Sequence, residues 1–231
     1  MIAHRTSEWF KARIGKFTAS NFPDLMSKPA DKSALISKSA LNCIETAAAQ
    51  LFYNQYHERA DSEPTRWGLR YESMAIQVFS ERTNFQTKEL GFVIHPLISS
   101  VGATPDTQVI DFECLDKLIL AQIKCPYSSE YHKDYLNKIY DTTSLKKKKS
   151  AFFWQMQGEM WITNADYSYF VSFDPRLLGR NECLHFVKIL RDESAINEIE
   201  IVIKKSIELR DIILDDFKKG IRYPKSLSDY Y

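Results

Sequence analysis

A turn aspartate and a lysine at the end of an apolar segment give this sequence its clearest chemical signal. Asp106 closes the motif Thr104-Pro105-Asp106, and Lys124 ends segment 117–124, which has the continuous apolar character of a buried strand. Side chains alternate along a strand, so Gln122 and Lys124 are expected to face one cleft. Carboxylates hold a hard divalent cation through oxygen, and a lysine positions water and screens phosphate. The pattern predicts magnesium-assisted phosphodiester cleavage.

Gln122 occupies the position where this chemistry calls for a second acid. Glutamine keeps the size and one carbonyl oxygen but loses the charge, so we expect a deficit of roughly 2–4 kcal/mol, or about two to three decades of rate. Three explanations stay open: an engineered inactivating change, a natural variant, or a protein that binds DNA ends without cutting them. Asp111 or Glu113 could compensate, although nothing in the sequence places either in the cleft.

Composition bounds the class of protein. A chain of 231 residues fits a single domain, and a net charge of +1 requires any nucleic-acid binding to come from local patches. The four cysteines form no CxxC pair, which argues against a zinc knuckle or a disulfide framework and favours a reducing compartment. The charged N-terminus and the lack of a membrane-length apolar run predict a soluble, cytoplasmic protein.

Periodicity and cap residues predict the elements that would position these groups. Ser7 is expected to cap a helix that Gly15 ends, and Thr18 or Ser20 to cap a second helix. Further helices are expected at 33–55, 67–79, 127–143, 152–162 and 195–219, and strands at 85–95, 98–103, 117–124, 167–175 and 183–190. Segment 56–65 is expected to be a polar connection.

Three further groups are candidates for contacts with DNA or metal. Glu72 is expected at the edge of the apolar face of helix 67–79, where it either faces the cleft or is solvated. Arg13, next to the expected helix N-terminus at 17–23, either holds a phosphate or lies on the surface. The lysines of 146–149 form either a solvated loop or a set of phosphate contacts.

In this order, the motifs resemble those of the phage lambda exonuclease and YqaJ-like viral recombinase family of RecB-like nucleases, within the PD-(D/E)xK superfamily. The resemblance rests on Trp9–Gly15 with Thr18–Ser20, Trp67-Gly68 with Tyr71-Glu72, Thr104–Asp106, Gln122–Pro126, Gln155–Gln157 with Met160-Trp161, and Asp174–Arg176. It implies an α/β (α+β) fold with a restriction-endonuclease-like core. A central mixed β-sheet would be flanked by helices in a single nuclease domain, 1–231.

The resemblance also implies a role for each matching residue. Glu72, Asp106, the acid position held by Gln122 and the backbone carbonyl of Ile123 would ligate Mg²⁺, which Mn²⁺ could replace. Lys124 would act on the attacking water, and Gln155 would help to position that water or the scissile phosphate. Arg13 and Ser20 would hold the 5′-phosphate of a DNA end.

The resulting hypothesis is a metal-dependent exonuclease that degrades one strand of linear duplex DNA from the 5′ end. By the same resemblance it would act in phage-type recombination, in the cytoplasm of the host cell, as a homo-oligomer such as a trimer. It would pass its 3′ overhang to a single-strand annealing recombinase. A DNA-end binding protein without turnover and a sequence-specific endonuclease remain alternatives.

Overall fold

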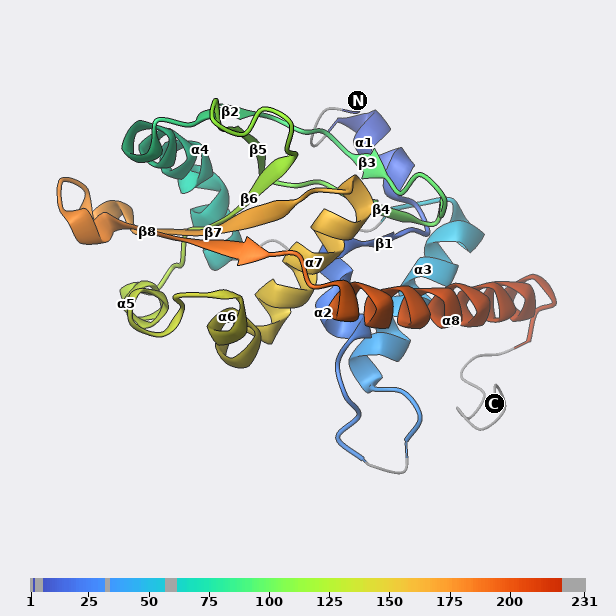
Figure 1. Cartoon of the computed structure of the whole chain (residues 1–231). Helices are drawn as coiled ribbons and strands as arrows, with labels where there is room; N and C mark the ends of the chain where they lie inside the picture. Colours follow the sequence, from blue (N-terminus) through green and yellow to red (C-terminus); the bar gives the residue numbers. More distant parts are fainter. Residues whose placement is uncertain (1, 3–5, 32–33, 57–61, 222–231) are drawn as a thin grey trace.

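A five-stranded mixed sheet forms the centre of the computed structural model, which describes residue 2 and residues 6–31, 34–56 and 62–221 (Figure 1). Its strand order is β2-β5-β6-β7-β8, with bounds Gln86–Lys88, Thr107–Ile110, Ile119–Lys124, Tyr167–Phe173 and Leu184–Leu190. Strands β6 and β7 run parallel, whereas the other neighbouring pairs are antiparallel. The predicted central mixed sheet is therefore confirmed.

Strand β6 is mostly apolar because helices cover both faces of the sheet. Ile119, Ala121 and Ile123 belong to the core cluster that includes Ala75 and Phe79 of helix α4 (Glu63–Thr83). On the other face, the cluster around Leu120 takes in α7 (Ser150–Thr163), α5 (Ser129–Lys138) and the segment leading into and through α6 (Thr142–Lys148). A strand buried on both faces reads as a continuous apolar run, which is the signal that the sequence carried.

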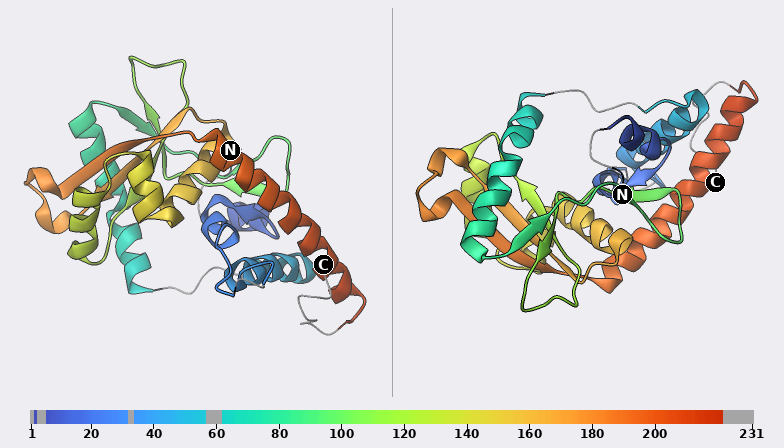
Figure 2. Two further views of the ribbon diagram at one scale, coloured as in Figure 1. Left: turned by 60° about the horizontal axis from the view of Figure 1, so that its bottom comes forward. Right: turned by 90° about the horizontal axis from the view of Figure 1, so that it is seen from above.

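A second group of elements packs beside the sheet (Figure 2). A small sheet has the order β1-β4-β3, from Phe17–Thr18, Val101–Ala103 and Val93–Ile94. Helices α2 (Phe22–Leu25), α3 (Lys38–Tyr53) and α8 (Glu193–Lys218) share one apolar cluster with it. Trp161 and Ile162 of α7 belong to that cluster, so α7 links the two groups.

Several predicted elements are confirmed, with shifts of a few residues at their ends. Strands at 117–124, 167–175 and 183–190 and helices at 152–162 and 195–219 are present as β6, β7, β8, α7 and α8. Helix α1 (Ser7–Arg13) is capped by Thr6, whose side chain accepts the Trp9 N–H, and not by Ser7. Gly15 lies just beyond its end at φ +65°, a conformation that glycine adopts without strain.

Other predicted elements differ from the structure. Segment 17–23 begins as strand β1, where Phe17 pairs with Val101 of β4, so this part of the helix prediction was wrong. The predicted cap Thr18 is confirmed, since it caps the 3₁₀ turn Ala19–Asn21 that leads into α2. Segment 85–95 divides into β2 and β3, which belong to different sheets. The lysines 146–148 lie in helix α6 and not in a loop.

The remaining differences concern where helices α3 and α4 begin and which residues α4 buries. Helix α3 begins at Lys38, capped by Ser37, and part of the predicted start lies at residues 32–33, outside the described residues. In the predicted connection 56–65, residues 57–61 are also outside them, while Glu63 already opens α4. Met74, expected on the buried face of α4, is exposed. No helix in the described ranges is both long and apolar enough to cross a membrane.

Candidate active site

The turn after β4 carries Asp106 to the end of β6. Strand β5 begins directly after Asp106, and its Thr107 pairs with Ala121 of β6. The Oδ2 atom of Asp106 accepts the backbone N–H of Ile123 at 2.6 Å and the side-chain amide of Gln122. Two segments sixteen residues apart in sequence therefore meet at one point, as the sequence predicted.

A chain of hydrogen bonds continues from the strand into helix α7. Gln155 Nε2 donates to Gln122 Oε1 at 2.7 Å and to Glu159 Oε1 at 2.9 Å. Lys124 Nζ donates to Gln155 Oε1 at 3.3 Å and lies 4.9 Å from the centroid of the Phe152 ring. The predicted residues Gln122, Lys124 and Gln155 are thus in direct contact on the face of the sheet that α7 covers.

Glu72 of α4 joins this site from the other side. It is half-buried, and it lines the same cavity of about 300 Å³ as Asp106. Burial, followed by the charges of Glu72 and Asp106, raises the pKa of the Cys125 thiol to about 12. The helical and turn carboxylates therefore open onto one cavity, and Cys125 stays a neutral thiol beside them.

Burial dominates the electrostatics of Asp106. It raises the pKa of this carboxyl, and the Lys124 charge and the Ile123 N–H only partly oppose the shift. An ionised carboxylate in such a place is stabilised by a nearby cation. Asp106 is therefore a group whose charge a bound metal ion would favour.

The donor atoms at this site fit a hard divalent cation in their chemistry. They are carboxylate oxygens from Asp106 and Glu72 and the amide oxygen of Gln122, which are the ligand types that Mg²⁺ prefers. In the described part of the chain, however, no three histidine, cysteine, aspartate or glutamate side chains lie close enough together to hold a metal ion. With glutamine at position 122, the site has two of the three acids expected around the metal.

Sequence reasoning missed Glu159, a carboxylate 1% exposed on α7. Burial, with a smaller contribution from the Asp106 charge, raises its pKa to about 8. The signal was available, since a charged residue inside the apolar run 152–162 lies four positions after Gln155, on the same face of a helix. The proposed compensators Asp111 and Glu113 lie instead in the turn between β5 and β6, at the opposite end of β5 from Asp106.

Replacing Glu159 with glutamine should stabilise the fold at alkaline pH. The pKa of Glu159 is about 8 in the folded state against an ordinary value of 4.5, so the folded state binds the extra proton between these pH values and stability falls as pH rises through them. The Glu159→Gln variant should match the unsubstituted protein at pH 4–5 and exceed it at pH 8–9, by on the order of 4 kcal/mol. Thermal melting across this pH range checks the prediction, and parallel curves would contradict it.

Arg13 and Ser20 line a separate cavity of about 420 Å³. Arg13 is buried and lies 4.1 Å from the centroid of the Trp9 ring, and its Nη2 donates to Thr18 Oγ1 at 3.4 Å. Thr18 Oγ1 lies 2.9 Å from Ser20 Oγ. The reading of Arg13 as a surface arginine was wrong, because the guanidinium is held inside this cavity.

The two cavities are linked by one hydrogen bond. Trp9, which lines the Arg13 cavity, donates from Nε1 to Thr104 Oγ1 at 3.0 Å. Thr104 lines the cavity shared by Asp106 and Glu72. The motif Thr104-Pro105-Asp106 thus contacts both cavities: Thr104 bonds to Trp9 of the Arg13 cavity, and Asp106 lines the cavity that it shares with Glu72.

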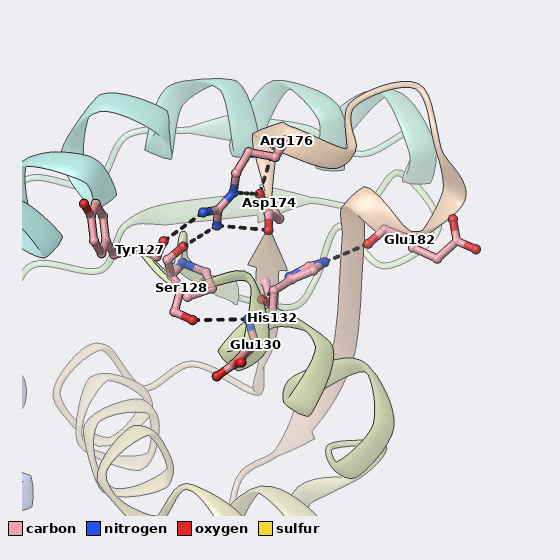
Figure 3. A network of polar contacts seen from close by, with 9 residues as sticks. Tyr127, Ser128, Glu130, His132, Asp174, Arg176 and Glu182 are labelled. Carbon is pink, nitrogen blue, oxygen red and sulfur yellow. Dashed lines mark hydrogen bonds and ion pairs between the residues drawn. The ribbon is translucent and has the colours of Figure 1, made fainter.

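The motif Asp174-Pro175-Arg176 binds the segment Pro126-Tyr127, which follows β6 (Figure 3). Arg176 Nε lies 2.7 Å from Asp174 Oδ1, and Arg176 donates to the carbonyls of Tyr127 at 2.9 Å and Pro126 at 3.3 Å. Burial alone would raise the pKa of Asp174, but hydrogen bonds from Arg176 and Ser129 lower it below its usual range. The ion pair between buried Asp174 and exposed Arg176 therefore holds the segment that follows Lys124.

The lysine run splits between two environments. Lys146 lies 4.8 Å from the centroid of the Phe153 ring and 3.4 Å from Asp192, while Lys149 lies 5.2 Å from the centroid of the Tyr135 ring. Lys146, Lys147 and Lys148 are all exposed on α6. The contact of these lysines with phosphate stays a prediction.

Solved structures of known proteins share this fold. A solved alkaline exonuclease (LHK-Exo) from Laribacter hongkongensis is 28% identical, with a TM-score of 0.77 over 93% of this chain and 97% of that one. A second structure of LHK-Exo holds dAMP. A phage-related exonuclease from Haemophilus somnus 129PT, 15% identical with a TM-score of 0.69 over 87% of this chain and 96% of that one, shares the fold.

Sequence comparison gives the family directly. The protein named ExoD from Escherichia coli (strain K12) is 38% identical over 63 residues, which are 27% of this chain and 70% of ExoD. The family profile of the YqaJ-like viral recombinase domain matches residues 8–166, a range that contains Arg13, Glu72, Asp106, Lys124 and Gln155. The chain belongs to the YqaJ-like viral recombinase domain family.

Proposed function

We propose that this protein is a metal-dependent exonuclease that degrades one strand of linear duplex DNA from its 5′ end. The observation that carries the proposal is the convergence of Asp106, Glu72 and Lys124 around the end of β6. The similarity to the alkaline exonuclease LHK-Exo and the dAMP bound to that protein support DNA as the substrate and a mononucleotide as the product.

Each residue at the site has a role in this proposal. A bound Mg²⁺ or Mn²⁺ would polarise the scissile phosphate and lower the pKa of a bound water, with Glu72, Asp106, the Gln122 amide oxygen and the Ile123 carbonyl holding it. Lys124 and Gln155, already in contact at 3.3 Å, would orient the attacking water and the phosphate. Water would add to phosphorus as the bond to the 3′ oxygen of the terminal nucleotide breaks. That nucleotide leaves with a 3′-hydroxyl and the 5′-phosphate it already carried, and the new 5′-phosphate stays on the shortened strand.

The Arg13 cavity would hold the 5′-phosphate of the DNA end. Its guanidinium is fixed by Trp9 and Thr18, and Ser20 adds a hydroxyl donor at the same wall. A charge-assisted hydrogen bond to phosphate from a pre-positioned arginine contributes about 1.5–3 kcal/mol. The Trp9–Thr104 hydrogen bond would keep a fixed spacing between the bound end and the cleavage site.

Arg13→Ala should therefore weaken the preference for 5′-phosphorylated over 5′-hydroxyl ends by about 10- to 100-fold. The kcat/KM ratio for the two duplexes measures this preference directly. Ser20→Ala should move the ratio in the same direction by less, because it removes a neutral donor. An equal loss on both kinds of end would instead assign Arg13 to general backbone contact.

Turnover itself is tested on linear and closed circular duplex with Mg²⁺ or Mn²⁺. The proposal predicts loss of nucleotides from the 5′ strand of the linear duplex, no cutting of circles and no reaction in EDTA. Cutting of circles would support the endonuclease alternative. A Gln122→Glu version belongs in the same assay. If neither protein cuts linear DNA while both bind its ends, the enzyme reading fails.

A DNA-end binding protein without turnover is the second candidate. It is favoured by the Gln122 amide, which donates to Asp106 in place of a third carboxylate. A ring-shaped oligomer and a single-strand annealing partner also belong to the proposal, on the strength of the family alone. Mass photometry of the protein with and without DNA tests the first of these.

A further inference from the structure

Helix α7 carries a buried carboxylate that the proposed reaction does not use. Glu159 is 1% exposed, and its Oε1 accepts a hydrogen bond from Gln155. Its Oε2 is buried with no hydrogen-bond partner within the described residues. A buried carboxylate with one unsatisfied oxygen destabilises a fold, so packing alone gives no reason for a glutamate here.

Gln157 shows what a structural polar group on the same helix looks like. It is fully buried, its Nε2 donates to the Leu190 carbonyl at 2.8 Å, and its Oε1 accepts the Asp192 N–H at 2.8 Å. Both ends of its amide are satisfied by backbone groups. Within the described residues, the Glu159 carboxylate accepts no hydrogen bond from the backbone, and its partner is Gln155 of the candidate site.

The contacts of Glu159 lead step by step to Asp106. Gln155 donates to both Glu159 and Gln122, and Gln122 in turn donates to Asp106. The carboxylates of Glu159 and Asp106 accept hydrogen bonds at the two ends of this series, and they thereby fix the orientation of the Gln155 and Gln122 amides between them. In that orientation the Gln155 oxygen faces Lys124 Nζ at 3.3 Å.

Charge counting shows what the site lacks. A divalent cation together with Lys124 carries three positive charges, whereas Glu72 and Asp106 carry two negative ones. Position 122, on strand β6, contributes none. Glu159 lies one helical turn from Gln155 and is connected to Gln122 through a single side chain, so it is placed to supply the third charge.

We propose that Glu159 is a positioning residue that supplies the third negative charge of the site from helix α7, through Gln155, in place of an acid at position 122. This inference rests on the proposed metal-dependent function of the same site. The charge of a buried carboxylate acts over several ångströms and favours the bound cation, and the hydrogen bond to Gln155 fixes the direction of that amide.

Four proteins test the proposal: the unsubstituted chain, Glu159→Gln, Gln122→Glu, and the double variant. Mn²⁺ affinity is measured by calorimetry without DNA, and kcat/KM is measured against pH on linear duplex with Mg²⁺. Glu159→Gln should weaken Mn²⁺ binding and lower kcat/KM by about 10- to 100-fold, as loss of a supporting charge does. Adding Glu159→Gln to Gln122→Glu should change either quantity by less than about threefold, because the charge then comes from β6.

The pH profile and a control separate this role from a structural one. The alkaline rise of kcat/KM, which needs an ionised Glu159, should move to lower pH in the double variant. Gln157→Leu, on the same helix, should lower the melting temperature and leave Mn²⁺ affinity unchanged. Equal losses from Glu159→Gln in both backgrounds, or no loss in either, would overturn the proposal.

The outcome is distinguishable from failure of the proposed function. If the Mn²⁺ affinities follow the expected pattern while no protein cuts DNA, the role of Glu159 stands and the exonuclease proposal fails. If all four proteins cut linear DNA and the pattern is missing, the exonuclease proposal stands and the role of Glu159 fails.

Discussion

Asp106→Ala is expected to abolish metal-dependent cleavage, with a loss of at least about three decades in kcat, or roughly 4 kcal/mol of transition-state stabilisation. Asp106 is the turn carboxylate that meets the end of β6, where it accepts the Ile123 N–H at 2.6 Å. Without it, the side-chain oxygen donors proposed for the metal fall to the Glu72 carboxylate and the Gln122 amide. Single-turnover cleavage of 5′-labelled linear duplex in Mg²⁺ measures the loss.

The fold should survive this change. Removing the carboxylate leaves the Ile123 N–H unpaired, which costs about 1–3 kcal/mol. It also removes a buried acid whose pKa burial has raised, and this offsets part of the cost. Asp106→Asn, which can still accept that N–H, should be equally inactive with a smaller change in melting temperature.

Glu113→Ala is the matched control, because Glu113 is an exposed acid at the far end of the same hairpin. It should leave cleavage unchanged. Full activity in the Asp106 variants would remove this residue from the mechanism, and unfolding of both variants, detected by circular dichroism, would show instead that its role is structural.

Lys124→Met should lower kcat by about 10²- to 10⁴-fold while leaving DNA-end affinity within a few-fold. Methionine keeps an unbranched stem that can pack against Phe152, so the substitution removes mainly the charge that contacts Gln155 Oε1. The loss should appear in kcat and not in KM, because one cation among several contributes little to duplex binding.

Lys188→Met provides the comparison for this variant. Lys188 also lies over an aromatic ring, 3.7 Å from the centroid of Tyr167, but on strand β8 at the edge of the sheet. Its substitution should leave kcat unchanged. A fall in DNA affinity that accounts for the whole effect of Lys124→Met would assign Lys124 to binding.

Local sequence patterns determined the strands and helices whose signals are strong. The run 117–124 predicted β6 because a strand buried on both faces has a nearly continuous run of apolar residues. The alternation along it placed Gln122 and Lys124 on one face, and the residues Thr104-Pro105 predicted that Asp106 lies in a tight turn. The motif order was sufficient for the family, which the match over 8–166 confirms.

Short strands were beyond the reach of local pattern. Phe17–Thr18 forms β1 only because Val101 and Gly102 of β4 lie beside it, and no window around position 17 contains that partner. Segment 85–95 divides for the same reason, since its two ends pair with β5 and β4 in different sheets. For Phe17, pairing with a strand far away in the sequence overrode the local preference for a helix.

Only the tertiary structure decided which groups share the site. The sequence determined that an aspartate, a glutamine and a lysine would lie at strand ends, because alternation and turn chemistry act over a few residues. The spacing of four residues marked Glu159 on the same helix face as Gln155, but the packing of α7 on β6 placed both beside the strand-end groups. Contacts between distant segments depend on how whole elements dock, and burial then sets the charge of the groups that docking brings together.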